Sequence, residues 1–276
     1  MSRTLIQAAL RGEPGTTTVD GREGRAPAGT HNVRSVEKAF TVLEALRDAG
    51  RSLSLSDLVT LSGLDKSAAQ RFTRTLRDLG YLRQDPRTRH YELSAKVLDL
   101  SFSYLNASDL VTRAAPSMIK LRDRTNERID LSLLDGGSLI YLFRLQSKPE
   151  TVSAALIGRR VPLYCTAGGR AVLARMDEGT ARALVEASDR VQHTPDSLTD
   201  PDAIIEAVRK ARSDGFALQS GEWRRGELVV ASAITDHDGR PVGAMHIVGS
   251  ASEWAADEFG RRMGLLVAQA AQDVSL

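Results

Sequence analysis

The chain has 276 residues, 42% hydrophobic and 26% charged, which is enough for one large or two ordinary domains with their own cores. These fractions exclude a wholly disordered chain and a fibrous protein. No run of about 18 apolar residues exists, which excludes a membrane-spanning helix, and the first residues lack the pattern of a secretion signal. The single cysteine, Cys165, excludes an internal disulfide and a CxxC metal site, so we expect a cytoplasmic protein.

The first segment, residues 1–32, is rich in glycine and threonine and carries almost no large apolar side chain after Leu10. This composition predicts a flexible tail. An unselected leader is the alternative to a functional arm.

Three short helices and a hairpin are predicted over residues 33–93. Ser54 and Asp57 form a capping-box-like start for the second helix. After the third helix the pattern changes to strand, turn and strand, with Pro86 where a type I turn needs a fixed φ. The helices are expected at about 35–49, 54–62 and 66–79. Three helices followed by a two-stranded ribbon predict a winged helix-turn-helix.

The third predicted helix has two chemically different faces. Its apolar face, suited to a small core, consists of Ala69, Phe72, Leu76 and Leu79. The opposite face lacks acidic residues and offers arginine for guanine, glutamine for adenine, and serine and lysine for the backbone. Arginines of the predicted wing can lie across an adjacent groove or phosphate row. The predicted DNA contacts are Lys66, Ser67, Gln70, Arg71, Arg74, Arg87 and Arg89.

Positive charge is concentrated in this part of the chain. The net charge is only +2, but residues 66–92 hold seven basic and three acidic side chains. A solvated helix face is the alternative explanation for Arg71 and Arg74. The helix before them and the arginine-bearing wing after them favour double-stranded DNA as a partner.

A connecting helix is predicted over 94–109, where Leu98, Phe102 and Leu105 recur at helical spacing. Beyond it, antiparallel strands with helices grouped around them predict an α+β domain over 110–276. Its helices are expected at about 110–125, 166–176, 177–187, 201–213 and 253–272. Its strands are expected at about 129–133, 139–145, 216–219, 227–235 and 241–249.

The run SLSLSDLVTLSGLDKSAAQRFTRTLRDLGYLRQDPRTRHYELSAKVLDLS resembles the N-terminal domain of the IclR family of bacterial transcription regulators. Three later segments resemble, in the same order, the effector-binding domain of that family: LDGGSLIYLFRLQS, IGRRVPLYCTAGGRAVLA and DGFALQSGEWRRGELVVASAITDHDGRPVGAMHIVGS. The resemblance covers about residues 33–272. It implies a GAF-like (profilin-like) effector domain after the linker helix, and a homodimer or a dimer of dimers.

The resemblance also implies a small-molecule site on the curved sheet of the second domain. The family's small-acid sensors line it with a small-residue pair, an acidic residue, a cysteine and two serines. These match Ala167 and Gly168, Ser220, Val229, and His246 and Val248. Only the small pair is retained, so we expect a larger, more apolar or aromatic organic acid. The predicted effector contacts are Tyr164, Ala167, Gly168, Ser220, Val229, His246 and Val248.

Each of these contacts has a structural alternative. Small residues from Thr166 to Gly169, directly before a helix, suit a carboxylate through free backbone N–H groups, or serve tight helix–sheet packing. His246 is alternatively a hydrogen-bonded sheet histidine. Trp223, a possible stacking partner for the ligand, is alternatively ordinary packing. Of the three candidate carboxylate clamps we expect only one to touch the ligand: Arg144, Arg159 or Arg160.

Two other classes of function are weaker. An enzyme would depend on Cys165, His237 and Asp238, but the last two lie in a polar turn, and Cys165 has no nucleophile elbow or paired base. An architectural DNA-binding protein would be small and broadly basic. We therefore predict a ligand-responsive regulator of a catabolic operon that is not an enzyme and uses no cofactor, metal or membrane. It should be at least a homodimer, because one recognition helix reads too few base pairs.

Overall fold

The computed structural model describes residues 32–148 and 157–276. They divide into two compact units between Ala107 and Ser108. The tail expected over 1–32 lies, apart from Asn32, outside the described residues. Within the described ranges, no helix has the length and apolar character needed to cross a membrane.

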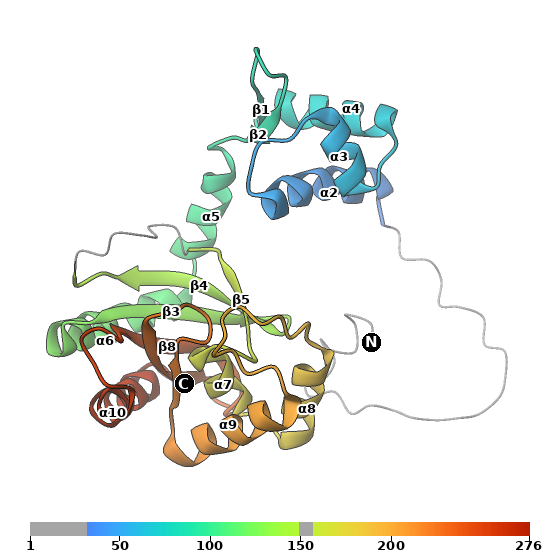
Figure 1. The fold of residues 1–276 in the computed structure, drawn as a ribbon. Coiled ribbons are helices and arrows are strands. Elements are labelled where there is room, and N and C mark those ends of the chain that lie inside the picture. Colours follow the sequence, from blue (N-terminus) through green and yellow to red (C-terminus); the bar gives the residue numbers. More distant parts are fainter. Residues whose placement is uncertain (1–31, 149–156) are drawn as a thin grey trace. The chain divides into compact units, whose positions relative to one another are not determined.

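The first unit contains three helices and a hairpin (Figure 1). Its helices are α2 (Arg34–Ala49), α3 (Leu55–Ser62) and α4 (Lys66–Asp78), and its strands are β1 (Leu82–Gln84) and β2 (Tyr91–Leu93). The predicted capping box is present, with the Ser54 hydroxyl accepting from Asp57 N at 3.1 Å and the Asp57 carboxylate accepting from Ser54 N at 3.0 Å. Apolar side chains from all three helices and both strands meet in one core. The winged helix-turn-helix prediction is confirmed.

Helix α5 (Val97–Asn106) follows the wing and buries none of its residues. Four of its large apolar side chains are more than half exposed: Leu98, Leu100, Phe102 and Tyr104. An apolar helix surface of this kind marks a place where another surface packs.

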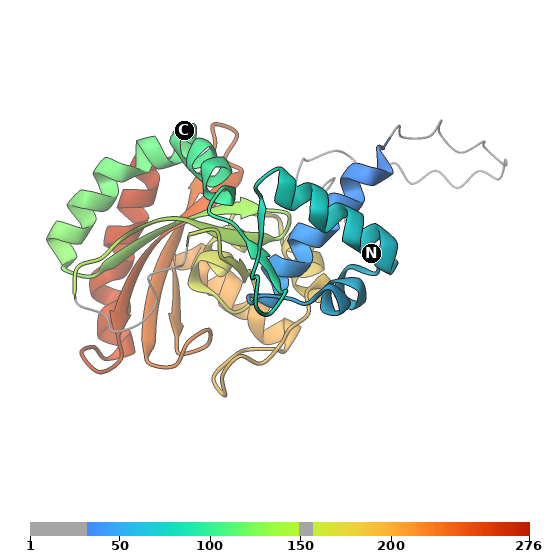
Figure 2. The ribbon, with the colours of Figure 1, turned by 90° about the horizontal axis from the view of Figure 1, so that it is seen from above.

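The second unit is built on a six-stranded antiparallel sheet in the order β5-β4-β3-β8-β7-β6. The strands are β3 (Arg128–Asp135), β4 (Ser138–Leu145), β5 (Arg160–Pro162), β6 (Ala217–Ser220), β7 (Glu227–Thr235) and β8 (Pro241–Ser250). Helices α6 (Asp109–Thr125) and α10 (Ala256–Val274) cover one face. The other face is covered by α7 (Ala167–Leu173), with α8 (Glu178–Ala187) and α9 (Pro201–Asp214) beyond it (Figures 1 and 2). The α+β prediction is confirmed; β5 was not predicted, because three residues show no alternation.

Strand register determines which side chains share the α7 face. Three rows cross β7, β8 and β3, and they are Val229–Val248–Arg128, Ala231–His246–Asp130 and Ala233–Ala244–Ser132. The residues of β7 in these rows are small and apolar, whereas those of β3 are polar. The register therefore gathers polar side chains over the β3 side of this face.

Candidate DNA-binding and effector-binding sites

Helix α4 exposes the face that the sequence assigns to DNA. Asp65 caps the helix by accepting from Ala68 N at 2.8 Å. All five predicted contacts on the helix are exposed: Lys66, Ser67, Gln70, Arg71 and Arg74. The Arg71 guanidinium makes no hydrogen bond or ion pair with any residue that the structure describes, and Arg74 has only a 3.8 Å contact with Asp78. Such a face presents uncommitted donors to a partner.

The opposite face of α4 differs from the prediction at Leu79 and at Thr73. Leu79 is more than half exposed because the helix ends at Asp78. Thr73 is fully buried instead, with its hydroxyl donating to the Ala69 carbonyl at 2.9 Å.

The turn of the wing is organised by Asp85, whose carboxylate accepts from the backbone N–H groups of Arg87 at 2.7 Å and Thr88 at 2.9 Å. These hydrogen bonds lower the pKa of Asp85. Arg87 and Arg89 are exposed at the tip of the hairpin. Arg83 instead pairs with Glu92 on the neighbouring strand, at 2.6 and 3.0 Å. The two tip arginines are thus the cations that the wing offers.

Seven polar side chains gather on the α7 face of the sheet in the second unit. We call them the polar cluster: Arg128, Asp130, Ser132, Tyr141, Arg144, Glu227 and His246. Asp130, which is fully buried, accepts from Arg144 at 2.7 and 3.0 Å and from Arg128 at 3.3 Å. Arg128 also donates to Glu227 at 3.2 and 3.3 Å. Buried ion pairs add little stability, and burial of several charges is typical of functional sites.

His246 lies at the centre of the polar cluster. Its Nε2 is 2.8 Å from the Ser132 hydroxyl, which also reaches the Ala244 carbonyl at 3.3 Å. With the hydroxyl donating to that carbonyl, Nε2–H donates to the hydroxyl. Burial lowers the pKa of His246 to about 4, so the ring is neutral at pH 7.

Helix α7 packs closely on this imidazole. A Cβ on Gly168 would stand 2.2 Å from Cε1 of His246, and one on Gly169 would stand 2.2 Å from the Leu163 carbonyl oxygen. The Thr166 hydroxyl already accepts from Gly169 N at 3.2 Å. Tight packing, the structural alternative, therefore accounts for both glycines. Val229 and Val248 are buried neighbours in the same face, and Ala167 is buried at the start of α7.

Ser220, a predicted effector contact, does not lie on the α7 face with the other predicted contacts. Ser220 pairs with Leu228, which points to the other face of the sheet, and its side chain is exposed. Gln219 pairs with Val229 and is buried. With its amide oxygen turned toward the following loop, Gln219 accepts from the N–H groups of Gly221 and Trp223.

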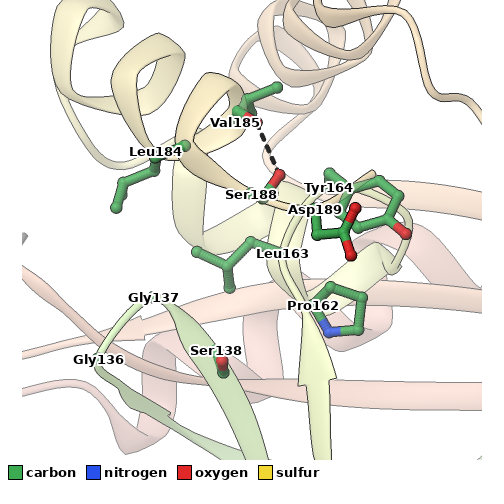
Figure 3. Close-up of a pocket in the computed structure, with 11 residues that line it drawn as sticks. Gly136, Gly137, Ser138, Pro162, Leu163, Tyr164, Leu184, Val185, Ser188 and Asp189 are labelled. Atoms are coloured by element: carbon green, nitrogen blue, oxygen red, sulfur yellow. Dashed lines mark hydrogen bonds between the residues drawn. The ribbon is translucent and has the colours of Figure 1, made fainter. Parts of the chain in front are cut away.

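Tyr164 lies away from the polar cluster. Its ring is buried and its hydroxyl donates to the Val191 carbonyl at 2.6 Å. It lines a separate cavity of about 260 Å³, between the β3–β4 turn and the end of α8 (Figure 3). Asp189 is the charged residue in its lining, and the carbonyl end of α8 is also negative. This cavity is unsuited to an organic anion.

The three candidate clamps have different surroundings. Arg144 belongs to the polar cluster. Arg160 pairs with the exposed Asp135, and the Arg159 guanidinium lies 5.4 Å from the centre of the Trp223 ring. Arg144 is therefore the candidate clamp that the fold brings to the predicted site.

A buried ion pair holds the loop that carries Trp223. Arg170 of α7 donates to both carboxylate oxygens of Glu222, at 2.5 and 2.6 Å. Glu222 also accepts from Leu198 N at 3.1 Å. The pair thus ties α7 to two loops beside the sheet.

The candidate nucleophile Cys165 is fully buried, and burial raises the pKa of its thiol to about 11. A protonated, enclosed thiol is a poor nucleophile at pH 7. His237 is exposed in its turn, 3.8 Å from Asp238.

Comparison with known proteins fits both units. The family description "Bacterial transcriptional regulator IclR C-terminal" matches residues 102–276, and "IclR helix-turn-helix domain" matches residues 35–86. The chain belongs to the IclR family. This IclR-family protein is 29% identical over 215 residues to the HTH-type transcriptional regulator XynR of Escherichia coli (strain K12), across 78% of this chain and 85% of XynR.

Solved structures share the fold of this IclR-family protein. A transcriptional regulator from Rhodococcus sp. RHA1 is 28% identical, with a TM-score of 0.74 over 88% of this chain and 97% of its own. An IclR homologue from Microbacterium hydrocarbonoxydans, complexed with 4-hydroxybenzoate, is 20% identical, with a TM-score of 0.70 over 87% and 97%. The matched helix-turn-helix domain and the likeness to XynR make the chain a DNA-binding transcription regulator of the IclR type.

Sequence reasoning missed five members of the polar cluster: Arg128, Asp130, Ser132, Tyr141 and Glu227. A usable signal was present in β3, where Arg128, Asp130 and Ser132 alternate with Ile129 and Leu131. Such alternation indicates a half-solvated strand, yet both faces of β3 are buried. A polar face on a central strand therefore identifies a polar site.

Proposed function

We propose that this regulator changes its affinity for operator DNA when a small organic acid binds its second unit, and thereby controls a catabolic operon. The observation that carries the proposal is one chain that combines an open cationic helix face with a sheet that buries charged side chains. The first feature suits DNA phosphates and base edges, and the second suits a polar ligand. Aromatic acids are the class we favour, because Val229 and Val248 are apolar where the family's small-acid sensors carry polar groups.

The proposed DNA contacts are those of α4 and the tip of the wing. In α4, Gln70 and Arg71 read bases, and neighbouring donors fix the helix to phosphates. In the wing, Arg87 and Arg89 contact the backbone of the DNA. The proposed effector contacts are Ala167, Gly168, Val229, His246 and Val248, together with the polar cluster.

We further propose that the working form is at least a homodimer. The exposed apolar side chains of α5 suit a second copy of the same helix, since like faces pair across a two-fold axis. Two recognition helices also read enough base pairs for a specific operator.

The test uses the full chain and DNA fragments that flank its own gene. Fluorescence anisotropy should give specific binding to one fragment that weakens or strengthens when an aromatic carboxylate is added. Specific binding that no carboxylate changes would favour an architectural role and contradict the sensor function. The same acids should raise the melting temperature, because a ligand at 100 times its Kd adds about 2.7 kcal/mol to stability.

A further inference from the structure

The bonds within the polar cluster are unequal. Arg144 holds Asp130 with two short bonds, 2.7 and 3.0 Å, within the range of strong charge-assisted hydrogen bonds. The bonds of Arg128 to Asp130 and Glu227 are longer, from 3.2 to 3.3 Å. The Arg144–Asp130 pair is thus the fixed part of the cluster, and the Arg128–Glu227 pair is the weaker part.

Glu227 is the carboxylate best placed to leave. Its side chain is 20% exposed, whereas that of Asp130 is 0% exposed. It is the first residue of β7, next to the loop that carries Trp223, and a second cation, Arg224, already lies 3.4 Å from its carboxylate. Glu227 can therefore move from Arg128 to Arg224 without losing an ionic partner.

Tyr141 supplies a hydrogen-bond donor on the same face of the sheet, where the charges of Asp130, Arg128 and Glu227 act on it. Its ring packs against His246, with the ring centres 5.6 Å apart. Burial, followed by the charge of Asp130, raises the pKa of Tyr141, so the hydroxyl keeps its proton. Across the described ranges of the chain, this hydroxyl has no hydrogen-bond partner. A partly buried donor without a partner beside charged groups is a place where a ligand oxygen gains a bond.

We propose that the carboxylate of the effector binds between Arg128 and the Tyr141 hydroxyl once Glu227 has moved from Arg128 to Arg224. This inference rests on the proposed sensor function and names the contacts that select the ligand. Val229 and Val248, in the same row as Arg128, contact the apolar body. The ligand class is a monocarboxylic acid with an apolar or aromatic body, because Asp130 stays in place and repels a second negative charge. Glu227 is an internal competitor that makes binding depend on the acid group.

The experiment measures calorimetric binding of 4-hydroxybenzoate and its neutral analogue 4-hydroxybenzamide to the full chain. Glu227→Gln should tighten binding of the acid by about tenfold, because the competing charge is removed, and should leave the amide unchanged. Glu253→Gln is the matched control. That carboxylate pairs with Lys148 outside the polar cluster, and its loss should alter the binding of neither the acid nor the amide. Glu227→Asp keeps the charge but has a shorter side chain, so it should also tighten binding of the acid relative to wild type.

Tyr141→Phe provides an independent readout. The substitution should weaken binding of the acid by about tenfold, since a hydrogen bond to a charged group is lost. It should not lower the melting temperature of the free protein. Acid binding that both Glu227 variants leave unimproved would overturn the inference while the sensor function stands. If wild type binds neither probe nor any of a panel of aromatic and aliphatic monocarboxylates, yet binds its operator, the acid-sensing function falls and this inference with it.

Discussion

Burial keeps His246 neutral in the folded protein, and the consequence is a pH-dependent stability. Its pKa falls from about 6.5 when unfolded to about 4 when folded. Between these values the unfolded chain binds a proton that the folded chain does not, so stability rises with pH in this window. This part of the folding stability is fully present above pH 6.5 and is lost as the pH falls toward 4.

His246→Gln should therefore flatten the loss of stability between pH 6.5 and 4. The difference in slope from wild type should integrate to at most about 3 kcal/mol. Urea unfolding at a series of pH values measures it. The matched control, His237→Gln, removes an exposed histidine and should keep the wild-type slope. An unchanged slope in His246→Gln would show that this imidazole titrates normally.

Gly168 is the residue whose lack of a side chain lets α7 approach His246. Gly168→Ala should lower stability by about 1–3 kcal/mol, because the added Cβ overlaps the imidazole and pushes it from Ser132. Thermal unfolding tests this against Gly179→Ala at the exposed start of α8, where the nearest atom to the added Cβ is Asp177 Oδ1 at 3.3 Å. If Gly168→Ala is as stable as Gly179→Ala, the added Cβ does not overlap the His246 imidazole. Its effect on ligand affinity tests separately the proposed effector contact.

Arg71 tests base reading by a single side chain. Arg71→Ala should weaken operator binding by about 1–3 kcal/mol and relax base preference at one position. Arg182→Ala removes the same charge from the second unit, where Arg182 pairs with Asp202, and should change little. Anisotropy with single-base operator variants gives both quantities. Unchanged operator affinity in Arg71→Ala would show that α4 is not docked as proposed.

At the scale of elements, the wing holds its tip in a conformation that its own sequence supports. Asp85 and Thr88 bond to the turn backbone, and Arg89 adopts φ +61°, in the left-handed region. Glycine adopts this region without a steric penalty, so Arg89→Gly removes the side chain without adding backbone strain.

Arg89→Gly should weaken binding to all DNA sequences by a similar factor. It should also reduce the slope of log K against log salt by about 0.9, the value for one lost phosphate contact. Arg83→Gln, in the same hairpin, should change the slope less, because Arg83 is already paired with Glu92. Salt titrations with operator and unrelated DNA make the comparison. A loss confined to the operator would mean that Arg89 reads bases.

At the scale of the whole molecule, an effector changes DNA affinity only if it binds two arrangements of the protein unequally. The coupling is reciprocal, so operator DNA must shift effector affinity by the same factor. The element proposed to change is α5, whose exposed apolar surface belongs to the unit that carries α4.

Phe102→Ala should keep effector affinity while weakening the effect of one ligand on the other. Because Phe102 belongs to the apolar surface proposed to pair two copies, basal operator binding should weaken as well. Phe102 is 70% exposed, so its loss creates no cavity within the chain and should leave folding intact. Titrations of effector with and without operator, and the reverse, measure the coupling twice. If wild-type coupling persists in Phe102→Ala, α5 does not transmit the signal through this side chain.

Local patterns in the sequence determined most of the secondary structure and the face of α4 that carries Gln70 and Arg71. Helical spacing, caps and turns depend on residues close together in the chain, so they can be recognised directly in the sequence. The effector site depended on tertiary structure. Whether Ser220 or Gln219 faces α7 is decided by strand register, in which one residue reverses the side chain, and Arg128 meets Glu227 only through pairing of strands about 100 residues apart. Cross-strand neighbours of this kind leave no local pattern, so the polar cluster became visible only in the folded sheet.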